Sequence, residues 1–353
     1  MVLIDAQQWT LNRYATFAEE VNLNYDSPDA TFKLTTKTYD TEDPELLKDG
    51  EILLETLYLS NDPAQKGWFT SRKSYVPPVP LGSVAPSQGI GRVIVSKSDD
   101  YSPGDIIYSR KVGWSTHNVI SPTPLDRKLD ASKVPHITKY LSAFGTTTLT
   151  AYFSAFKYSE LKPDDEGKIW LISGAAGAAG SSLVQIVAHL FKPKKIIAIA
   201  GGESKRKWVE TLGVNGNVIG VDYKSDDYND KFEEALNGEE IDVFVDHTFG
   251  KIVQVGSIAS YNDNTNFVFN SFFTVTTKRL RIQGMIVIDD IDDFPEAFTN
   301  LTEWFSNGKL DISKFEETVV DGKGVHFKDV PKLWTGLFTG QNKGKYITQV
   351  GDY

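Results

Sequence analysis

The stretch "IWLISGAAGAAGSSLVQIVAHL", residues 169–190, joins an apolar run to a helix-like pattern through three glycines spaced by three. The apolar residues 169–172 predict a buried strand, and residues 181–190 predict a helix. A turn with so few side chains has two interpretations. Either the helix packs very closely on the strand, or its N-terminus receives an anion, because free backbone N–H groups and the helix dipole both favour negative charge there.

The spacing of the glycines favours the second interpretation. A side chain at Gly177 would block a ligand from approaching the backbone, and one at Gly180 would separate the helix from the strand. The usual G-x-G-x-x-G pattern is not present, because Ala175 stands where its first glycine would be. The strand before the turn and the helix after it supply the context that a dinucleotide-binding motif requires. We therefore predict that this turn binds the pyrophosphate of a dinucleotide.

The end of the following strand favours NADP(H) over NAD. An acidic residue there would bind the ribose 2′-hydroxyl and repel a 2′-phosphate, but this strand ends in "AIAGG" (198–202) and holds no acid. Lys205, Arg206 and Lys207 follow, either as phosphate contacts or as a solvated helix face. Glu203 would offset part of their positive charge.

The composition excludes several classes of protein. A net charge of −10 leaves no basic excess for a nucleic-acid partner. Without cysteine there is neither a disulfide nor a cysteine-ligated zinc, and the five histidines show no metal-binding spacing, so no metal site is predicted. No apolar run approaches the 18 residues of a membrane span, and the N-terminus lacks the apolar core of a signal peptide. We expect a soluble cytoplasmic protein that does not enter a membrane.

The chain changes character along its length. Closely spaced strand and turn patterns in roughly the first 135 residues, such as "FKLTTKTYD" (32–40), predict a small β-barrel or sandwich. From Tyr140 to about Asp311, strand and helix patterns alternate, which predicts a parallel sheet covered by helices. The remaining residues are compatible with a return to the first domain.

Taken in order, several stretches resemble the zinc-independent medium-chain dehydrogenase/reductases, in particular the branch of prostaglandin reductases and alkenal and alkenone double-bond reductases. These stretches are "LYLSNDP" (57–63), "GWSTH" (113–117), "LTAYF" (149–153), "GAAGAAGS" (174–181), "YK" (223–224), "GSIASYN" (256–262) and "QNKGK" (341–345). The resemblance implies an α/β fold in which a GroES-like β-barrel substrate domain, residues 1–135 and 312–353, flanks a Rossmann domain with a doubly wound parallel sheet, residues 136–311. Family members are commonly dimers, so the resemblance also implies a homodimer.

The same resemblance implies a set of cofactor contacts. The pyrophosphate would be held by Gly177, Ala178, Ala179 and Gly180, and the 2′-phosphate by Lys205 and Tyr223. Residues of the "VGSIASY" segment would pass along the cofactor, namely Val255, Gly256, Ser257 and Tyr261. The nicotinamide would be bordered by Met285, Ile286 and Val287, and a phosphate would be reached by Asn342. His247 stands where the family has an asparagine.

The sequence departs from the family at two further places. The family's "DPYMR" is "DPAQK" (62–66) here, so Ala64 replaces the aromatic residue that often faces the substrate. In addition, "VDHTFG" runs directly into "KIVQVG", where the family has a helix of about a dozen residues between two parallel strands. A parallel crossover needs about ten residues or more. We expect that the protein has a further segment between Gly250 and Lys251 that is missing from this sequence, rather than that the sheet differs.

The predicted function is the NADPH-dependent reduction of the carbon–carbon double bond in α,β-unsaturated aldehydes and ketones, without zinc. Hydride added to the β-carbon builds negative charge on the carbonyl oxygen, so the protein must position that carbon and offer the oxygen a hydrogen-bond donor. Tyr261 is the candidate catalytic donor. A packing role for this tyrosine is the competing interpretation, and phenol is a weak acid near neutral pH.

Two other functions stay open at this stage. Quinone reduction by NADPH on the same scaffold would not need Tyr261. A non-catalytic nucleotide-binding protein is favoured by the loss of the motif's aromatic residue at Ala64.

Five aromatic residues have two interpretations: they either line an apolar substrate pocket or belong to the core. They are Tyr58, Trp68, Tyr75, Trp114 and Tyr152.

Overall fold

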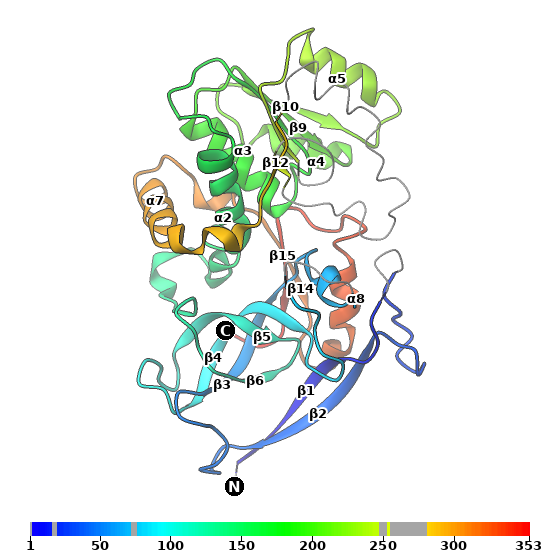
Figure 1. Ribbon diagram of the computed structural model, residues 1–353, viewed down its shortest axis with the longest axis vertical. Helices are drawn as coiled ribbons and strands as arrows, with labels where there is room; N and C mark the ends of the chain where they lie inside the picture. The colour runs from blue at the N-terminus through cyan, green and yellow to red at the C-terminus, as the bar shows by residue number, and fades with distance from the viewer. Residues whose placement is uncertain (1, 16–19, 72–75, 247–252, 255–280) are drawn as a thin grey trace.

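The computed structural model describes residues 2–15, 20–71, 76–246, 253–254 and 281–353. They form an α/β fold in which a parallel sheet with helices occupies one end of the molecule and a curved, mainly antiparallel sheet occupies the other (Figure 1). The predicted fold class is confirmed.

In the described part of the chain, the parallel sheet has six strands in the order β10-β9-β8-β11-β12-β13. Their bounds are β8 (Ile169–Ile172), β9 (Lys195–Ala200), β10 (Val218–Asp222), β11 (Val243–Asp246), β12 (Val253–Gln254) and β13 (Gln283–Gly284). The helices beside them are α2 (Thr146–Phe153), α3 (Ala178–Leu190), α4 (Glu203–Glu210), α5 (Tyr228–Leu236) and α7 (Phe294–Ser306). Because β8 pairs with β9 on one side and β11 on the other, the strand order reverses at β8, where ligands of such sheets bind.

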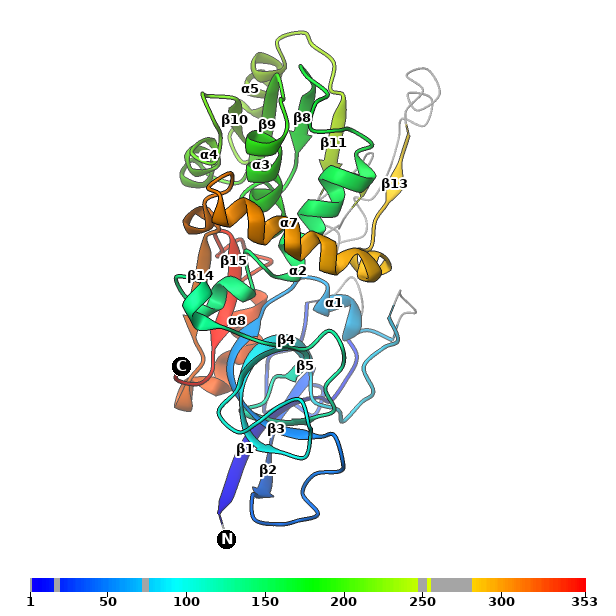
Figure 2. The same ribbon diagram turned by 90° about the vertical axis from the view of Figure 1, so that its left-hand side faces the viewer.

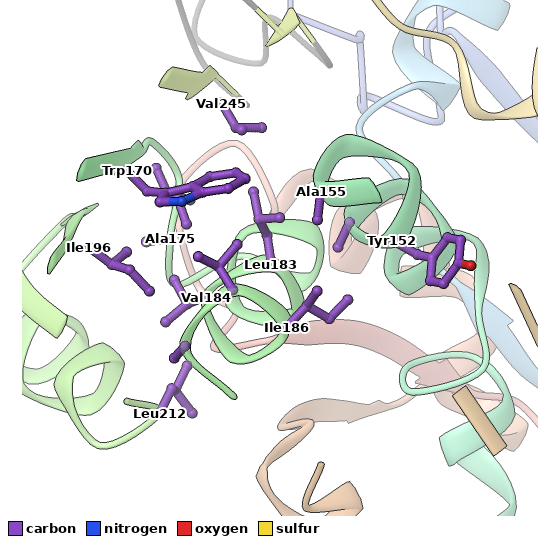
Figure 3. Packing of buried hydrophobic residues seen from close by; sticks show 14 of the residues in the cluster. Tyr152, Ala155, Trp170, Ala175, Leu183, Val184, Ile186, Ile196, Leu212 and Val245 are labelled. Carbon is purple, nitrogen blue, oxygen red and sulfur yellow. The ribbon is translucent and has the colours of Figure 1, made fainter. Parts of the chain in front are cut away.

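Alternate residues of β8 face opposite cores, which explains why the strand is apolar throughout. Trp170 and Ile172 belong to the larger core beneath α2, α3 and α7, whereas Leu171 packs with Val221 and Ala235 beneath α5. Figure 3 shows the larger core from close by, with the indole of Trp170 near Val245 and the side chains of α3. A strand buried on both faces is typical of doubly wound sheets.

The second sheet joins segments from the two ends of the chain. Within the described residues its order is β14-β15-β3-β4-β5-β7, with β6 paired to β3. Its strands are β3 (Ile52–Ser60), β4 (Pro86–Ser96), β5 (Ile106–Gly113), β6 (His117–Ile120), β7 (Arg127–Lys128), β14 (Glu317–Asp321) and β15 (Lys345–Gln349). The antiparallel pairing of Ile347 with Ser60 brings the end of the chain back to the barrel. The boundaries at residues 135 and 312 stay a prediction.

The remaining elements frame these two sheets. A separate ribbon is formed by β1 (Leu3–Leu11) and β2 (Phe32–Asp40), which pair antiparallel. Two short helices accompany the barrel, α1 (Gln65–Trp68) and α8 (Val330–Thr335). The 3₁₀ helices are Ala131–Lys133, Ile137–Tyr140, Val287–Asp293, Ile312–Lys314 and Gly324–Asp329, and Ser154–Tyr158 is a π-helical turn after α2. Seen from the side, α7 crosses in front of the parallel sheet, above the barrel (Figure 2).

The aromatic residues considered for a substrate pocket are mostly core residues. Trp114 is completely buried and packs edge-on to Phe69, and Tyr58 is buried in a smaller cluster of the barrel. Tyr152 is buried beneath α7, where its hydroxyl accepts a hydrogen bond of 2.7 Å from the Asn300 amide. Trp68 is half-buried, and Tyr75 lies outside the described residues.

The strands on either side of the short "VDHTFGKIVQVG" connection are neighbours in the sheet. Val245 pairs with Val253 and Asp246 with Gln254, both parallel. The pairing is the one that a regular crossover would produce, although only residues 247–252, which lie outside the described residues, join the two strands.

We therefore expect the protein from its native source to be heavier than the 39.3 kDa of this chain. The additional mass would equal that of a short helix, because a parallel crossover must span the sheet and return to its starting edge. Intact-mass measurement together with peptide mapping across Gly250 and Lys251 checks this. A mass equal to that of the chain would show that the short connection is native.

Gly180 allows α3 to approach the end of β8. A Cβ at this position would lie 2.3 Å from the carbonyl oxygen of Gly174 and 2.8 Å from the Cα of Ala175. Both are backbone atoms, so the helix would have to move away from the turn.

Gly180→Ala is expected to lower the free energy of unfolding by about 1–3 kcal/mol, the usual cost of overpacking a close contact. Ala179→Ser, a change at the half-exposed neighbouring position, is the matched control and should stay within about 0.5 kcal/mol of the parent. Urea unfolding followed by circular dichroism measures both. Equal stability of Gly180→Ala and the parent would contradict the close packing.

Candidate functional site

The glycine-rich turn presents an uncapped helix N-terminus at the carboxyl edge of the parallel sheet. Gly174 adopts a left-handed conformation with φ +57°, which turns the chain after β8. Gly177 is the N-cap of α3, and no side chain caps the helix. No side-chain cap therefore occupies the N–H groups of Ala178, Ala179 and Gly180. Together with the positive end of the helix dipole, these free donors favour the binding of a phosphate.

The two serines that follow in α3 do not compete for that phosphate. Ser182 Oγ donates to the carbonyl oxygen of Ala178 at 2.9 Å, and it lies 2.9 Å from the hydroxyl of Thr148 in α2. Ser181 Oγ lies 3.4 Å from the same carbonyl. An anion at the start of α3 would therefore be held mainly by main-chain donors.

The segment Gly340–Lys345, here called the C-terminal strap, crosses from the barrel onto the glycine-rich turn. The Gly344 N–H donates to the carbonyl oxygen of Ala176 at 2.9 Å, and the Asn342 side chain donates to the Gly344 carbonyl at 2.9 Å. The predicted phosphate contact Asn342 is thus held beside the predicted pyrophosphate turn, although more than 150 residues separate them in the sequence.

The strap also ties the turn to the "NDP" motif of the barrel. The Lys345 ammonium lies 2.5 Å from a carboxylate oxygen of Asp62, and both side chains are largely buried. Asp62 receives a second hydrogen bond from Ser60, and its main-chain carbonyl accepts from the Trp334 indole. No spacing in the sequence predicts this ion pair, although Asp62 lies in the "LYLSNDP" stretch and Lys345 in "QNKGK".

A second positively charged region lies at the end of β9 and β10. The Lys205 ammonium donates to the carbonyl oxygen of Gly340 in the strap at 2.7 Å. Burial lowers the pKa of Lys205, and the neighbouring ammonium of Lys224 lowers it further. Among the described residues, no carboxylate forms an ion pair with either lysine. Two close cations without an anion favour the binding of a dianionic group such as a phosphate monoester.

The other basic residues of α4 are neutralised within the helix. Arg206 donates to both carboxylate oxygens of Glu203, at 2.6 and 2.9 Å, and also contacts Glu210 at 2.8 Å. Lys207 lies 3.1 Å from Glu203. These partners, Arg206 first, lower the pKa of Glu203 to about 2. The solvated-face interpretation therefore holds for Arg206 and Lys207 but not for Lys205.

Tyr223 follows β10 and lies beside this pair of lysines. Its ring is more than half exposed and covers the Cα of Gly201, and the Lys224 ammonium lies 5.9 Å from the ring centre. The two residues predicted to contact a 2′-phosphate, Lys205 and Tyr223, thus both lie near Lys224. Lys224 was missed as a possible contact, although it directly follows Tyr223 in the quoted "YK".

The predicted nicotinamide segment directly follows β13, so it lies at the same edge of the parallel sheet as the glycine-rich turn. Met285 is buried, and its sulfur accepts a hydrogen bond of 3.3 Å from Ser154 in the π-helical turn. Ile286 and Val287 are partly exposed. Met285 therefore supports this segment from the core, while the next two residues are accessible to a ligand.

Five predicted site residues lie outside the described residues: His247, Val255, Gly256, Ser257 and Tyr261. The last described residue before four of them is Gln254, at the end of β12. Because β12 is parallel to its neighbours, it ends at the edge that carries the glycine-rich turn.

A small polar cavity lies beside the start of α3. Its volume of about 10 Å³ accommodates one water-sized molecule, not a nicotinamide. The Thr147 hydroxyl in its wall is buried and has no partner within the described residues. The other lining residues are Ser142, Ala178, Ser181, Ser182, Phe315, Glu316 and Lys345. Over the same described residues, no group of three or more His, Cys, Asp or Glu side chains could hold a metal ion.

Comparison with known proteins gives matches along the whole chain. Residues 25–127 match a family model described as the N-terminal domain of oxidoreductase. An uncharacterized membrane protein of Saccharomyces cerevisiae is 43% identical over 99% of this chain and all of its own length. A putative NADP-dependent oxidoreductase of Bacillus subtilis is 34% identical, covering 86% of this chain and 90% of the relative. Prostaglandin reductase 1 of Bos taurus is 28% identical over 98% of this chain and all of its own.

The fold has a close structural counterpart. The crystal structure of CurA in complex with NADPH from Vibrio vulnificus matches with a TM-score of 0.81 and 24% identity, covering 98% of this chain and all of that one. The alignment with the yeast relative extends over 370 positions, more than the 353 residues present here. That relative therefore contains residues with no counterpart in this chain.

One expectation from the sequence is corrected by these matches. The prediction of a cytoplasmic protein is contradicted by the yeast relative, which is named a membrane protein. In the part of the chain that the structure describes, no helix combines the length and the apolar character needed to cross a bilayer.

The first two relatives each share more than 30% identity with this chain over most of its length, and one of them is named an NADP-dependent oxidoreductase. The glycine-rich turn, the two lysines beside Tyr223 and the strap that carries Asn342 agree with that description. The chain belongs to the zinc-independent medium-chain dehydrogenase/reductases.

Proposed function

We propose that this member of the family is an NADPH-dependent reductase of the carbon–carbon double bond in small α,β-unsaturated aldehydes and ketones. The general class, an oxidoreductase that uses NADP(H), agrees with the names of two relatives of this chain. The proposed substrate class, α,β-unsaturated aldehydes and ketones, draws support from relatives named prostaglandin reductase 1 and 2-alkenal reductase. The observation that carries the proposal is the pair formed by Lys205 and Lys224, which lacks a carboxylate partner within the described residues.

Two regions of the chain fit the two phosphate groups of such a cofactor. The main-chain donors from Ala178 to Gly180 suit a pyrophosphate, and Asn342 is close enough to the turn to contribute a side-chain donor. Lys205, Lys224 and the hydroxyl of Tyr223 suit the additional phosphate on the ribose. When bound, NADPH supplies a hydride from its nicotinamide ring.

The residues of the chain must then bind the substrate and stabilise the charge that develops on its carbonyl oxygen. Ile286 and Val287 offer an apolar border for the nicotinamide and exclude water from one side of it. Tyr261 is our candidate to donate a hydrogen bond to the carbonyl oxygen. It follows β12 in the sequence, and β12 ends at the edge of the sheet that carries the other contacts. Hydride addition to the β-carbon leaves an enolate of the substrate, and a proton delivered to its α-carbon by Tyr261 or by water gives the saturated product.

A substrate panel tests the proposed activity. With NADPH in excess, we expect turnover of a short 2-alkenal and an aryl enone, measured by the loss of absorbance of the reduced cofactor. Turnover confined to a benzoquinone would favour quinone reduction instead. Tight NADPH binding without turnover of an enal, an enone or a quinone would favour a non-catalytic nucleotide-binding protein.

Cofactor preference tests the role of Lys205. We expect the kcat/KM for NADPH to be well above that for NADH, and Lys205→Met to lower the NADPH value about 10- to 100-fold by removing a charged hydrogen bond. The matched control is Lys207→Met, whose ammonium is paired with Glu203 and which should change neither value. Equal values for the two cofactors in the parent protein would overturn NADP(H) as the preferred cofactor.

The role of Tyr261 is tested by Tyr261→Phe. Loss of one donor to the developing oxyanion is expected to lower kcat on an enone about 100-fold, with the Kd for NADPH unchanged. The control is Tyr228→Phe, at a tyrosine of α5 that packs against Leu171 and Val221 of the sheet. If Tyr261→Phe turns over the enone at the parent rate, this residue has no catalytic role.

A further inference from the structure

Gly201 is a glycine whose backbone does not require one. Its φ is not among the positive values found for glycines of this chain, whereas its neighbour Gly202 has φ +92°. The space at Gly201 is what excludes a side chain. A Cβ there would lie 2.7 Å from Cε1 of Tyr223 and 3.0 Å from both Cζ and the hydroxyl oxygen. The ring of Tyr223 therefore occupies the volume in which a side chain of residue 201 would begin.

The backbone on both sides of this contact is held in place. The Tyr223 N–H donates to the carbonyl oxygen of Ala200 at 3.1 Å, which continues the pairing of β10 with β9. The Asp222 carboxylate accepts the N–H of Gly202 at 2.7 Å and the N–H of Lys224 at 2.9 Å. These bonds fix the main chain of residues 201 and 223 relative to each other, so a clash between them must be relieved by the side chain.

The ring is free to move away because little covers it. Tyr223 is 56% exposed, and the atoms of its side chain nearest to a Cβ at Gly201 are distal ones, namely Cε1, Cζ and the hydroxyl oxygen. A methyl group at residue 201 would therefore displace the ring into solvent without disturbing the core. The fold would tolerate the change, but the ring of Tyr223 would leave its present position near Lys224, the residue whose charge also acts on Lys205.

The location of Gly201 gives this contact a consequence for cofactor choice. The residue follows the last position of β9, where an acid would bind a ribose 2′-hydroxyl and repel a 2′-phosphate. An acid at residue 201 would do both, and it would also expel the Tyr223 ring. Conversely, the absence of a side chain at residue 201 allows the phenol ring to pack against the main chain, with the Lys224 ammonium 5.9 Å from the ring centre.

We propose that Gly201 is a specificity-determining residue for NADPH over NADH, because its bare Cα positions the ring of Tyr223 at the 2′-phosphate. The inference rests on the proposed use of NADP(H). It adds Gly201 to the residues that determine cofactor preference, although Gly201 has no side chain that could contact the cofactor. It predicts that Gly201 and Tyr223 act as one unit.

The test is a double-mutant cycle with Gly201→Ala, Tyr223→Ala and the combination of both, read by titration of tryptophan fluorescence with NADPH and with NADH. Gly201→Ala is expected to raise the Kd for NADPH about tenfold, through loss of one hydrogen bond to a charged group. The Kd for NADH and the thermal midpoint should not change. Tyr223→Ala should produce the same loss, and the double variant should lose no more than either single one.

Gly67→Ala is the control, because a Cβ at Gly67 meets nothing within 4 Å and its φ is not positive. Additive losses in the cycle, an equal loss of NADH affinity, or unfolding of Gly201→Ala would each overturn the inference. These outcomes differ from failure of the proposed function, which would appear in the parent protein as equal affinity for NADPH and NADH or as binding of neither.

Discussion

The close approach of α3 to the end of β8 is the constraint on which the site depends. With no Cβ at Gly180, the carbonyl oxygen of Gly174 and the Cα of Ala175 lie in the space that a side chain would fill. The helix therefore begins directly at the edge of the sheet, and its first N–H groups point to the place where the strand order reverses. If a methyl group at residue 180 pushed the helix away from the turn, the N-terminus of α3 would no longer lie directly at the edge of the sheet.

The site also depends on the strap, because the strap connects the glycine-rich turn of the parallel sheet to the barrel. Gly344 hydrogen-bonds the glycine-rich turn, Lys345 pairs with Asp62 of the barrel, and Gly340 accepts from Lys205 of α4. Lys343 adds a contact with the Trp208 ring at 5.2 Å and an ion pair with Glu316 at 3.1 Å. Within six residues, the strap thus contacts the barrel and the two regions proposed to bind the phosphate groups of the cofactor.

Features with a local cause could be predicted from the sequence. The glycine spacing, the apolar strand before it and the helix after it predicted the turn. That Asn342 of "QNKGK" reaches a phosphate stays a prediction, and the structure holds this residue beside the turn. Contacts between distant segments could not be predicted: the pair formed by Asp62 and Lys345 joins residues 283 positions apart, and no spacing rule connects them. Nor does composition distinguish a core aromatic from a pocket aromatic, which is why Trp114 and Tyr152 were left open. The packing of Tyr223 on Gly201 could not be predicted either, because a glycine in the sequence does not indicate which side chain occupies the space beside it.

The order of these elements along the chain has a consequence for how the protein is made. The described strands of the parallel sheet and the glycine-rich turn precede residue 285, but Asn342 and Gly344 follow much later. Synthesis from the N-terminus therefore releases the strand and the helix of the turn before the strap that contacts them. A nascent chain can form the start of α3 before the hydrogen bond from Gly344 to Ala176 becomes possible.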